Sequence, residues 1–166
     1  MADLTVTISE DVLLNGSTRG STNTLTITGI ETILERIVNV PASNDATVLL
    51  TKDTIHSEDG SVDIQDTKYI RITNLDSTNS VNLSLQIDRA EDDSGADESV
   101  TILLEAGRTF MLGTPHDAVG VFDTNSSITD THDLESILVD SGSNVVKLEL
   151  FVAGAYRRKL FKVFRS

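Results

Sequence analysis

The segment 69–88, YIRITNLDSTNSVNLSLQID, constrains the fold of this chain more than any other segment. Its apolar and polar residues alternate over two runs, and a short polar stretch separates the runs. In the second run Val81, Leu83, Leu85 and Ile87 share one face of an extended chain, and polar residues occupy the other face. This pattern predicts a hairpin of two strands in a half-buried antiparallel sheet.

The same alternation recurs along the whole chain. Residues 31–40 also contain apolar residues at helical spacing, but the β-branched residues and the nearby Pro41 favour a strand there. A second hairpin is predicted from residue 134 to residue 152 across the turn SGSN. The other predicted strands lie at residues 4–8, 23–30, 47–51, 62–64, 100–104, 109–112, 118–122 and 156–164.

About ten to twelve short strands with frequent turn signals are typical of a β-sandwich, a jelly roll or a Greek-key barrel. We therefore predict one all-β domain over residues 1–166, an antiparallel sandwich or jelly-roll-like fold with at most one short helix. The apolar residues of the alternating runs are expected to form its core. They are Leu25, Ile27, Ile70, Ile72, Val81, Leu83, Leu85, Ile102, Leu104, Phe110, Leu148 and Leu150.

Composition narrows the functional classes. The chain has no cysteine, which excludes disulfides and thiolate chemistry. It has no apolar run long enough to span a bilayer and no secretory leader pattern at its start, so we expect no membrane partner. Residues 157–166 carry five positive charges and no acid, which leaves a net charge of −18 on residues 1–156. An acidic body of this kind repels phosphate, so direct nucleic-acid binding is not expected.

No motif points to catalysis. The sequence contains neither G-x-S-x-G nor a phosphate-binding glycine loop, and it has no tryptophan to form a sugar platform. His116 and His132 adjoin Asp117 and Asp133, but neighbouring residues of a strand point in opposite directions and make a poor shared ligand set. Residues 123–134 resemble a calcium loop only weakly, because Ile128 and Leu134 occupy the glycine and glutamate positions. We expect no enzyme activity, no cofactor and no resident metal.

The C-terminal segment concentrates aromatic and basic residues, which are enriched in interface cores. Two alternatives remain open: a basic edge strand in solvent, or an assembly contact partly covered by another chain. The mixture of apolar and basic groups on both faces favours the contact. The predicted interface residues are Phe151, Tyr156, Arg157, Arg158, Lys159, Leu160, Phe161, Lys162, Phe164 and Arg165.

The phrases YIRITNLDSTNSVNLSLQID and VTILLEAGRTFMLG resemble small all-β virion proteins of tailed bacteriophages. In that family a strand ending in an Asn-Leu-Asp sequence pairs with the next strand, and a hairpin with an Ala-Gly turn follows. The resemblance covers residues 69–113 and, more loosely, the segment NVVKLELFVAG. It names no catalytic residues.

The resemblance implies a non-enzymatic structural protein of the virion, assembled in the host cytoplasm. Within that class we expect a capsid decoration or cement protein that contacts the major capsid protein and further copies of itself. The alternatives are a tail, neck or fibre-base protein of the same virion and, from a different class, a glycan-binding module used in host attachment.

Overall fold

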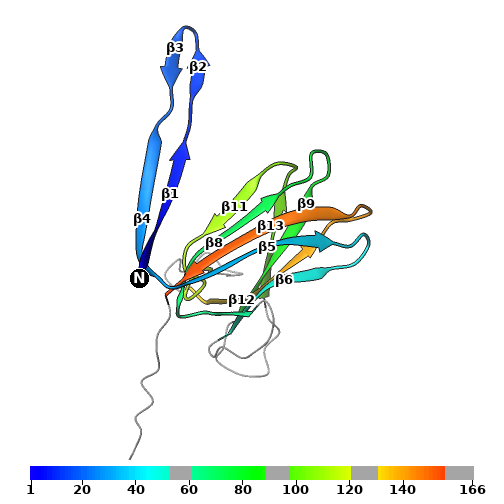
Figure 1. The fold of residues 1–166 in the computed structure, drawn as a ribbon. Helices are drawn as coiled ribbons and strands as arrows, with labels where there is room; N and C mark the ends of the chain where they lie inside the picture. Colours follow the sequence, from blue (N-terminus) through cyan, green and yellow to red (C-terminus); the bar gives the residue numbers. More distant parts are fainter. Residues whose placement is uncertain (53–60, 89–97, 121–130, 156–166) are drawn as a thin grey trace, which may run out of the picture.

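The structure is a computed structural model that describes residues 1–52, 61–88, 98–120 and 131–155. All regular structure in these residues is β, in thirteen strands, so the all-β prediction is confirmed. No helix capable of crossing a membrane occurs in the described part of the chain. The strands form a two-layered sandwich and a long hairpin that extends away from it (Figure 1).

The sandwich has the strand order of a jelly roll. Four antiparallel pairs are nested in the sequence, so that the first strand pairs with the last, the second with the second last, and so on inward. This is the arrangement obtained when one long hairpin is rolled up into two sheets. The nested pairs are β5 (Thr32–Val40) with β13 (Val146–Gly154), β6 (Ala46–Lys52) with β12 (Asp133–Asp140), β8 (Thr67–Asn74) with β11 (Thr109–Leu112), and β9 (Val81–Asp88) with β10 (Glu98–Leu104).

Two further pairings close the sheets. β13 also pairs with β8, which gives a four-stranded sheet in the order β11-β8-β13-β5. β12 also pairs with β9, and the short strand β7 (Ser61–Asp63) runs parallel to β6, which gives a five-stranded sheet in the order β10-β9-β12-β6-β7. The side chains that the two sheets turn toward each other form the main core.

The predicted core is largely confirmed, with one clear error. Eight of the twelve expected residues are buried: Ile70, Ile72, Val81, Leu83, Leu85, Leu104, Leu148 and Leu150. Ile102 and Phe110 are partly buried against this core, and Ile27 packs in a second, smaller cluster. Leu25 is 56 % exposed because it lies on the long hairpin, outside the sandwich.

The two predicted hairpins are wrong. β8 and β9 do not pair with each other, since β8 lies in the four-stranded sheet and β9 in the five-stranded sheet. β12 and β13 are separated in the same way, and so are β10 and β11 across the Ala-Gly turn. In each case the connection crosses from one layer to the other. An alternating pattern identifies the buried face of a strand, but both inner faces of a sandwich show the same pattern.

Asn74 and Asp76 build the connection between β8 and β9. The buried Asn74 side chain donates hydrogen bonds to the carbonyl oxygens of Asn79 (2.9 Å) and Leu104 (3.3 Å) and accepts one from the Asp76 backbone N–H (3.0 Å). The Asn74 backbone N–H donates to the carbonyl of Arg108 at 2.9 Å. The Asn-Leu-Asp sequence and the Ala-Gly turn therefore meet in one hydrogen-bonded crossing.

The Asp76 carboxylate predicts an acid-sensitive contribution to stability. It accepts hydrogen bonds from the backbone N–H groups of Asn79 (2.7 Å) and Thr78 (2.8 Å), and these bonds lower the pKa of Asp76. Because this pKa lies lower in the folded state, the contribution is complete above the unfolded-state pKa of about 3.9 and is lost as the pH falls through the folded-state value.

We therefore expect urea unfolding to show wild type more stable than Asp76→Ala at neutral pH, with the difference shrinking under acid conditions. Asp45→Ala removes the same charge from an exposed loop and serves as the control. A stability difference between wild type and Asp76→Ala that stays constant from neutral to acid pH would contradict this assignment.

Candidate functional site

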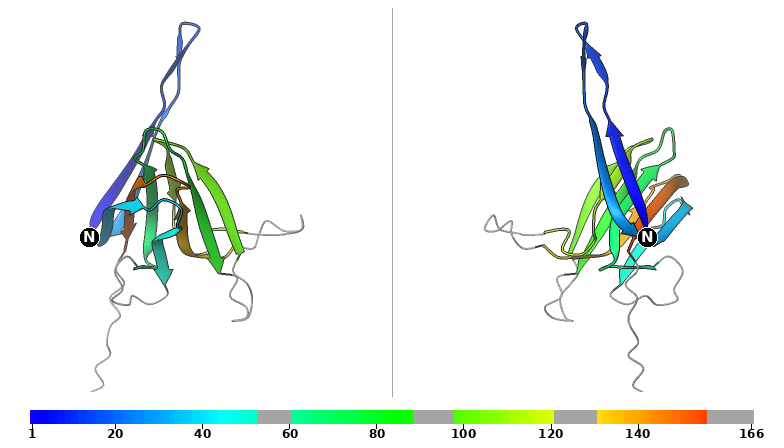
Figure 2. Two further views of the ribbon diagram at one scale, coloured as in Figure 1. Left: turned by 90° about the vertical axis from the view of Figure 1, so that its right-hand side faces the viewer. Right: turned by 60° about the vertical axis from the view of Figure 1, so that its left-hand side comes forward.

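The long N-terminal hairpin, here called the arm, comprises residues 2–30. Its strands are β1 (Ala2–Ser9), β2 (Val12–Leu14), β3 (Ser17–Arg19) and β4 (Thr22–Ile30). The register is constant from the Leu14↔Ser17 pair at the tip to the Leu4↔Ile27 pair near the base. Asn15 and Gly16 both have positive φ angles, 51° and 77°, as a two-residue hairpin turn requires. Figure 2 shows the arm projecting beyond the sandwich in both views.

The two faces of the arm differ in chemistry. One face carries aliphatic residues in cross-strand pairs, including Leu4↔Ile27 and Val6↔Leu25. The other face carries hydroxyl residues, and side-chain hydrogen bonds join Ser9 to Thr22 (3.0 Å) and Thr7 to Thr24 (3.4 Å). Residues 4–9 and 22–30 contain no charged side chain. In a protein with a net charge of −13, the long strands of the arm thus form an uncharged and partly apolar ribbon, and the charged side chains Glu10, Asp11 and Arg19 lie toward the tip.

The base of the arm is fixed on the outer face of the four-stranded sheet. Leu4, Val6 and Ile27 pack against a small cluster that includes Ile30, Tyr69 and Ala153. The rings of Tyr69 and Phe151 meet edge to face, with centroids 6.2 Å apart. Burial raises the pKa of the Tyr69 hydroxyl, an effect that the positive charge of Arg71 partly offsets. The arm therefore leaves the sandwich at a packed junction.

Arg71 links this junction to the rest of the outer face. Its guanidinium carbon lies 5.7 Å from the Phe151 ring centroid, within the range of a cation–π contact. Arg71 Nη1 also lies 2.6 Å from a Glu149 carboxylate oxygen and donates to the Thr73 hydroxyl at 2.8 Å. Phe151, the one predicted interface residue within the described part of the chain, is thus half-buried between Tyr69 and Arg71. Residues 156–165 of that prediction lie outside the described residues.

An apolar groove of about 310 Å³, here called the notch, lies between the arm and the four-stranded sheet. Strand β11, which forms one of its walls, is the edge strand of that sheet. Of the described residues that line the notch, only Lys68 is charged. The complete lining is Val6, Ile8, Asn23, Thr24, Leu25, Ile27, Lys68, Tyr69, Met111, Leu112 and Gly113.

The tip of the arm, Val12–Arg19, exposes three consecutive aliphatic residues. Val12, Leu13 and Leu14 are 56 %, 75 % and 55 % exposed. A run of exposed apolar residues is unfavourable in a soluble protein unless it is used for binding. The tip and the notch are therefore two surfaces, within the described part of the chain, that suit a partner.

Comparison with models of known protein families, with curated protein sequences and with solved structures finds no match.

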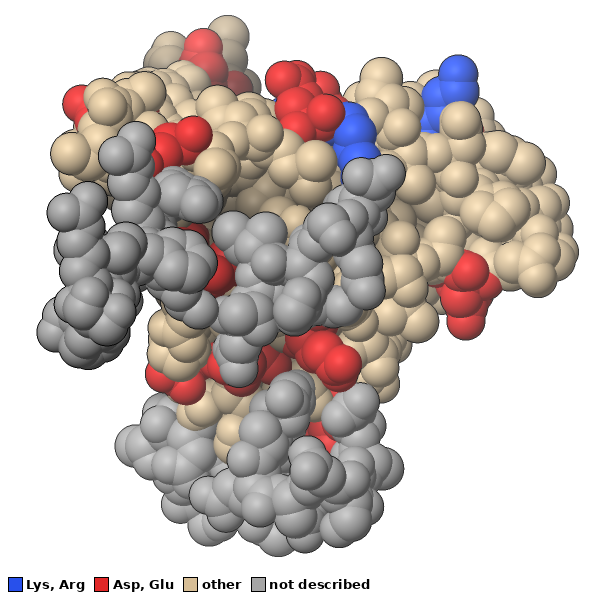
Figure 3. Space-filling view, turned by 60° about the horizontal axis from the view of Figure 1, so that its bottom comes forward, with Lys and Arg blue, Asp and Glu red and all other residues tan. Residues whose placement is uncertain are grey.

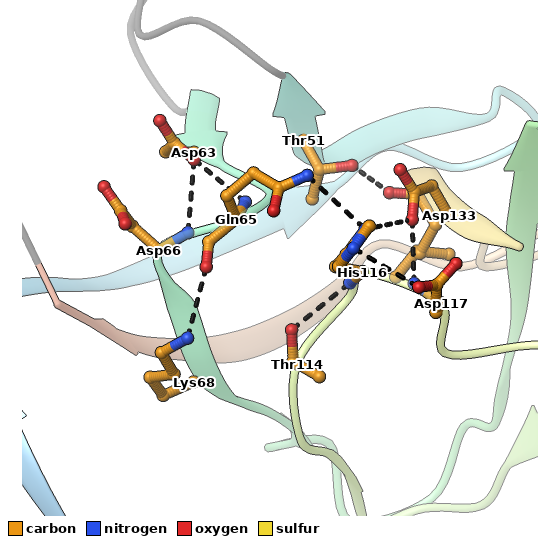
Figure 4. A network of polar contacts seen from close by, with 10 residues as sticks. Thr51, Asp63, Gln65, Asp66, Lys68, Thr114, His116, Asp117 and Asp133 are labelled. Carbon is orange, nitrogen blue, oxygen red and sulfur yellow. Dashed lines mark hydrogen bonds and ion pairs between the residues drawn. The ribbon is translucent and has the colours of Figure 1, made fainter. Parts of the chain in front are cut away.

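A second candidate is a polar cluster around His116, which joins the loop after β11 to the start of β12 (Figure 4). Asp133 Oδ1 lies 2.7 Å from His116 Nδ1 and accepts the Asp117 backbone N–H at 2.7 Å. His116 Nε2 lies 3.3 Å from Asp117 Oδ2. The expectation that His116 and Asp117 diverge is wrong, because they lie in a turn, where Asp117 has a φ of 48°, and not on a strand.

The cluster has the composition of a cation site, since His116, Asp117 and Asp133 each offer a ligand atom. Asp133 Oδ1, however, already contacts His116 Nδ1 and accepts the Asp117 backbone N–H, so the hydrogen bonds within the cluster account for its geometry without a cation. No serine or threonine hydroxyl of the described residues is hydrogen-bonded to Nε2, as a nucleophile paired with a histidine base would be. The contacts are those of an anchor that ties the loop to β12, together with the Leu134 N–H to Pro115 carbonyl bond (2.9 Å).

His132 does not join this cluster. Its backbone forms an isolated antiparallel bridge with Val119. This bridge is the only β-structure in the described part, residues 118–120, of the strand predicted at 118–122. His56 and residues 123–130, the first part of the segment that resembles a calcium-binding loop, lie outside the described residues. The absence of enzyme activity and of a resident metal stays a prediction.

Sequence reasoning missed the arm, although a signal for it was present. Asn-Gly at residues 15–16 is the strongest short hairpin signal, and alternating aliphatic residues flank it on both sides at matching distances. Nothing in that pattern tells that the hairpin projects from the body, because a strand pair inside a sheet shows the same alternation. The notch combines arm and sheet residues that are more than 40 positions apart, so it had no local signal.

Proposed function

We propose that this chain is a non-enzymatic structural protein of a tailed-phage particle, a capsid decoration or cement protein that binds its neighbours through the arm. The observation that carries the proposal is the arm itself, a ribbon anchored at its base and exposing aliphatic residues at its tip. An isolated two-stranded hairpin is marginally stable in water, so a long one is expected to be held by further contacts. The sequence of residues 69–113 also resembles small virion proteins of this class, although the two hairpins that this resemblance implies do not form here.

Charge supports an exterior position. Viewed from the end opposite the arm tip, the sandwich shows many Asp and Glu side chains and few Lys or Arg (Figure 3). An acidic outer surface keeps particles negatively charged and mutually repelling. Residues 4–9 and 22–30 of the arm carry no charge, so this part of the arm can approach another acidic protein without this repulsion. A cement protein needs this division, with a solvent-facing body and a reaching element that spans adjacent subunits.

The test is an arm-shortened variant in which Asn-Gly replaces residues 9–22. Ile8 and Asn23 are cross-strand partners, so a two-residue turn can connect them while the base stays packed on Tyr69. We expect a sandwich of unchanged stability, within about 0.5 kcal/mol, because the removed residues are exposed. Incorporation into particles should fall by at least about tenfold, as loss of an apolar anchor implies. Quantitative mass spectrometry of purified particles measures this.

Val145→Ser is the control, since Val145 is an equally exposed aliphatic residue on the body. Normal incorporation of the arm-shortened protein would overturn the assembly role of the arm. The number of copies per particle then distinguishes a capsid location from a tail or neck location, because a cement protein covers the whole shell and a tail or neck protein forms a single ring. Binding on a glycan array by the full chain, with no incorporation into particles, would favour the host-attachment alternative.

A further inference from the structure

The tip and the notch of this chain are complementary in three respects, and we propose that the notch receives the arm tip of a second copy. This inference deepens the proposed function, on which it rests, since it names the partner of the arm. The same chain then carries both halves of the contact, and copies join head to tail.

The first respect is apolarity. The tip offers Val12, Leu13 and Leu14, and the notch offers aliphatic and aromatic walls from the arm and from Tyr69 and Met111. A copy cannot fill its own notch with its own tip. Ile8 and Leu25 line the notch, and the tip continues the same extended hairpin beyond them, away from the body (Figure 1).

The second respect is backbone geometry. β11 is the edge strand of its sheet, and one row of its backbone N–H and C=O groups has no neighbouring strand among the described residues. Such an edge accepts an extended segment by strand addition. The tip consists of two short extended strands, β2 and β3, whose outer edges are likewise unpaired by any described strand. A hairpin therefore suits this groove better than a helix.

The third respect is charge. The only charged residue that lines the notch, among those described, is Lys68. Glu10 and Asp11 immediately precede the apolar run of the tip. A bound tip would bring these carboxylates to a cationic rim, and opposite charges at the rim of an interface set its register and specificity.

A head-to-tail contact has a distinctive experimental consequence. Leu13→Asp disables the tip and leaves the notch intact, whereas Met111→Asp disables the notch and leaves the tip intact. Both positions are exposed, at 75 % and 41 %, so both variants should fold. Leu103→Asp, with 60 % exposure on β10 of the other sheet, is the matched control.

Sedimentation velocity of the full chain measures the association. We expect wild type and Leu103→Asp to associate as concentration rises, and each of the other two variants to require at least about tenfold more protein. An equimolar mixture of Leu13→Asp and Met111→Asp should form a one-to-one heterodimer, because one intact tip meets one intact notch. Lys68→Glu should weaken association in the same way, and Asp11→Lys in the same chain should restore it.

Three results would overturn the inference: a wild-type protein that stays monomeric, a Leu13→Asp variant that associates normally, or a mixture that forms no heterodimer. The last result would indicate a symmetric contact between arms. Failure here is separable from failure of the proposed function. If the protein is monomeric but its incorporation into particles still requires the arm, the proposed virion role stands and the head-to-tail contact is wrong. If the protein associates with itself but is absent from particles, the head-to-tail contact stands and the proposed virion role is wrong.

Discussion

Replacement of Leu148 by alanine is expected to lower the free energy of unfolding by about 2–5 kcal/mol, the range found for large-to-small changes in well-packed cores. Leu148 is 1 % exposed and lies on β13, which has a neighbouring strand on each side in the four-stranded sheet. Its side chain belongs to the main core between the two layers. Rigid strands on both sides limit how far the site can collapse around the cavity.

Chemical denaturation with urea gives the measurement, and Leu103→Ala gives the control. Leu103 lies on β10 with 60 % exposure, so its truncation should change stability by no more than about 0.5 kcal/mol. Equal effects of the two substitutions would mean that the space between the sheets is not the core that stabilises the fold.

Substitution of Asn74 by alanine is expected to cost about 2–4 kcal/mol, although the residue is polar and lies at the end of a strand. The substitution leaves the carbonyls of Asn79 and Leu104 and the N–H of Asp76 without their side-chain partner. Unpaired buried polar groups cost about 1–3 kcal/mol each, and water entering the loop recovers part of this. The crossing from β8 to β9 should loosen as a result.

Two further substitutions sharpen this prediction. Asn74→Asp keeps an acceptor for the Asp76 N–H but loses the donor to both carbonyls, so it should be at least as destabilising as Asn74→Ala. Asn82→Ala, at an exposed position of β9, should have almost no effect. If Asn74→Ala has the same free energy of unfolding in urea as wild type, the crossing from β8 to β9 is held by its backbone hydrogen bonds alone.

The core of the sandwich was predictable because burial leaves a local record in sequence. Residues 81–88 alternate strictly, and their apolar members are all buried in the structure. Leu25 lies in an equally regular run and is exposed. The alternation reports that a strand has one apolar face, and it does not report what covers that face.

Pairing of strands was predictable only where the connection is too short to allow a choice. The arm turns over two residues, Asn15 and Gly16, and its strands pair with each other. Residues 75–80 between β8 and β9 are long enough to cross the sandwich, and they do so because Asn74 and Asp76 satisfy the backbone groups of the crossing. A polar stretch rich in Asn, Asp and Ser fits a hairpin turn equally well.

The sequence by itself determined the fold class, the buried faces of most strands, the absence of disulfide and thiolate chemistry, and the acidic charge of the body. These properties depend on composition and on short periodic patterns, which act within a few residues. Only the tertiary structure decided that the strands roll into a jelly roll, that the arm stands away from the body, and that the notch lies at its base. Each of these depends on contacts between residues far apart in the chain, and such contacts leave no local pattern to read.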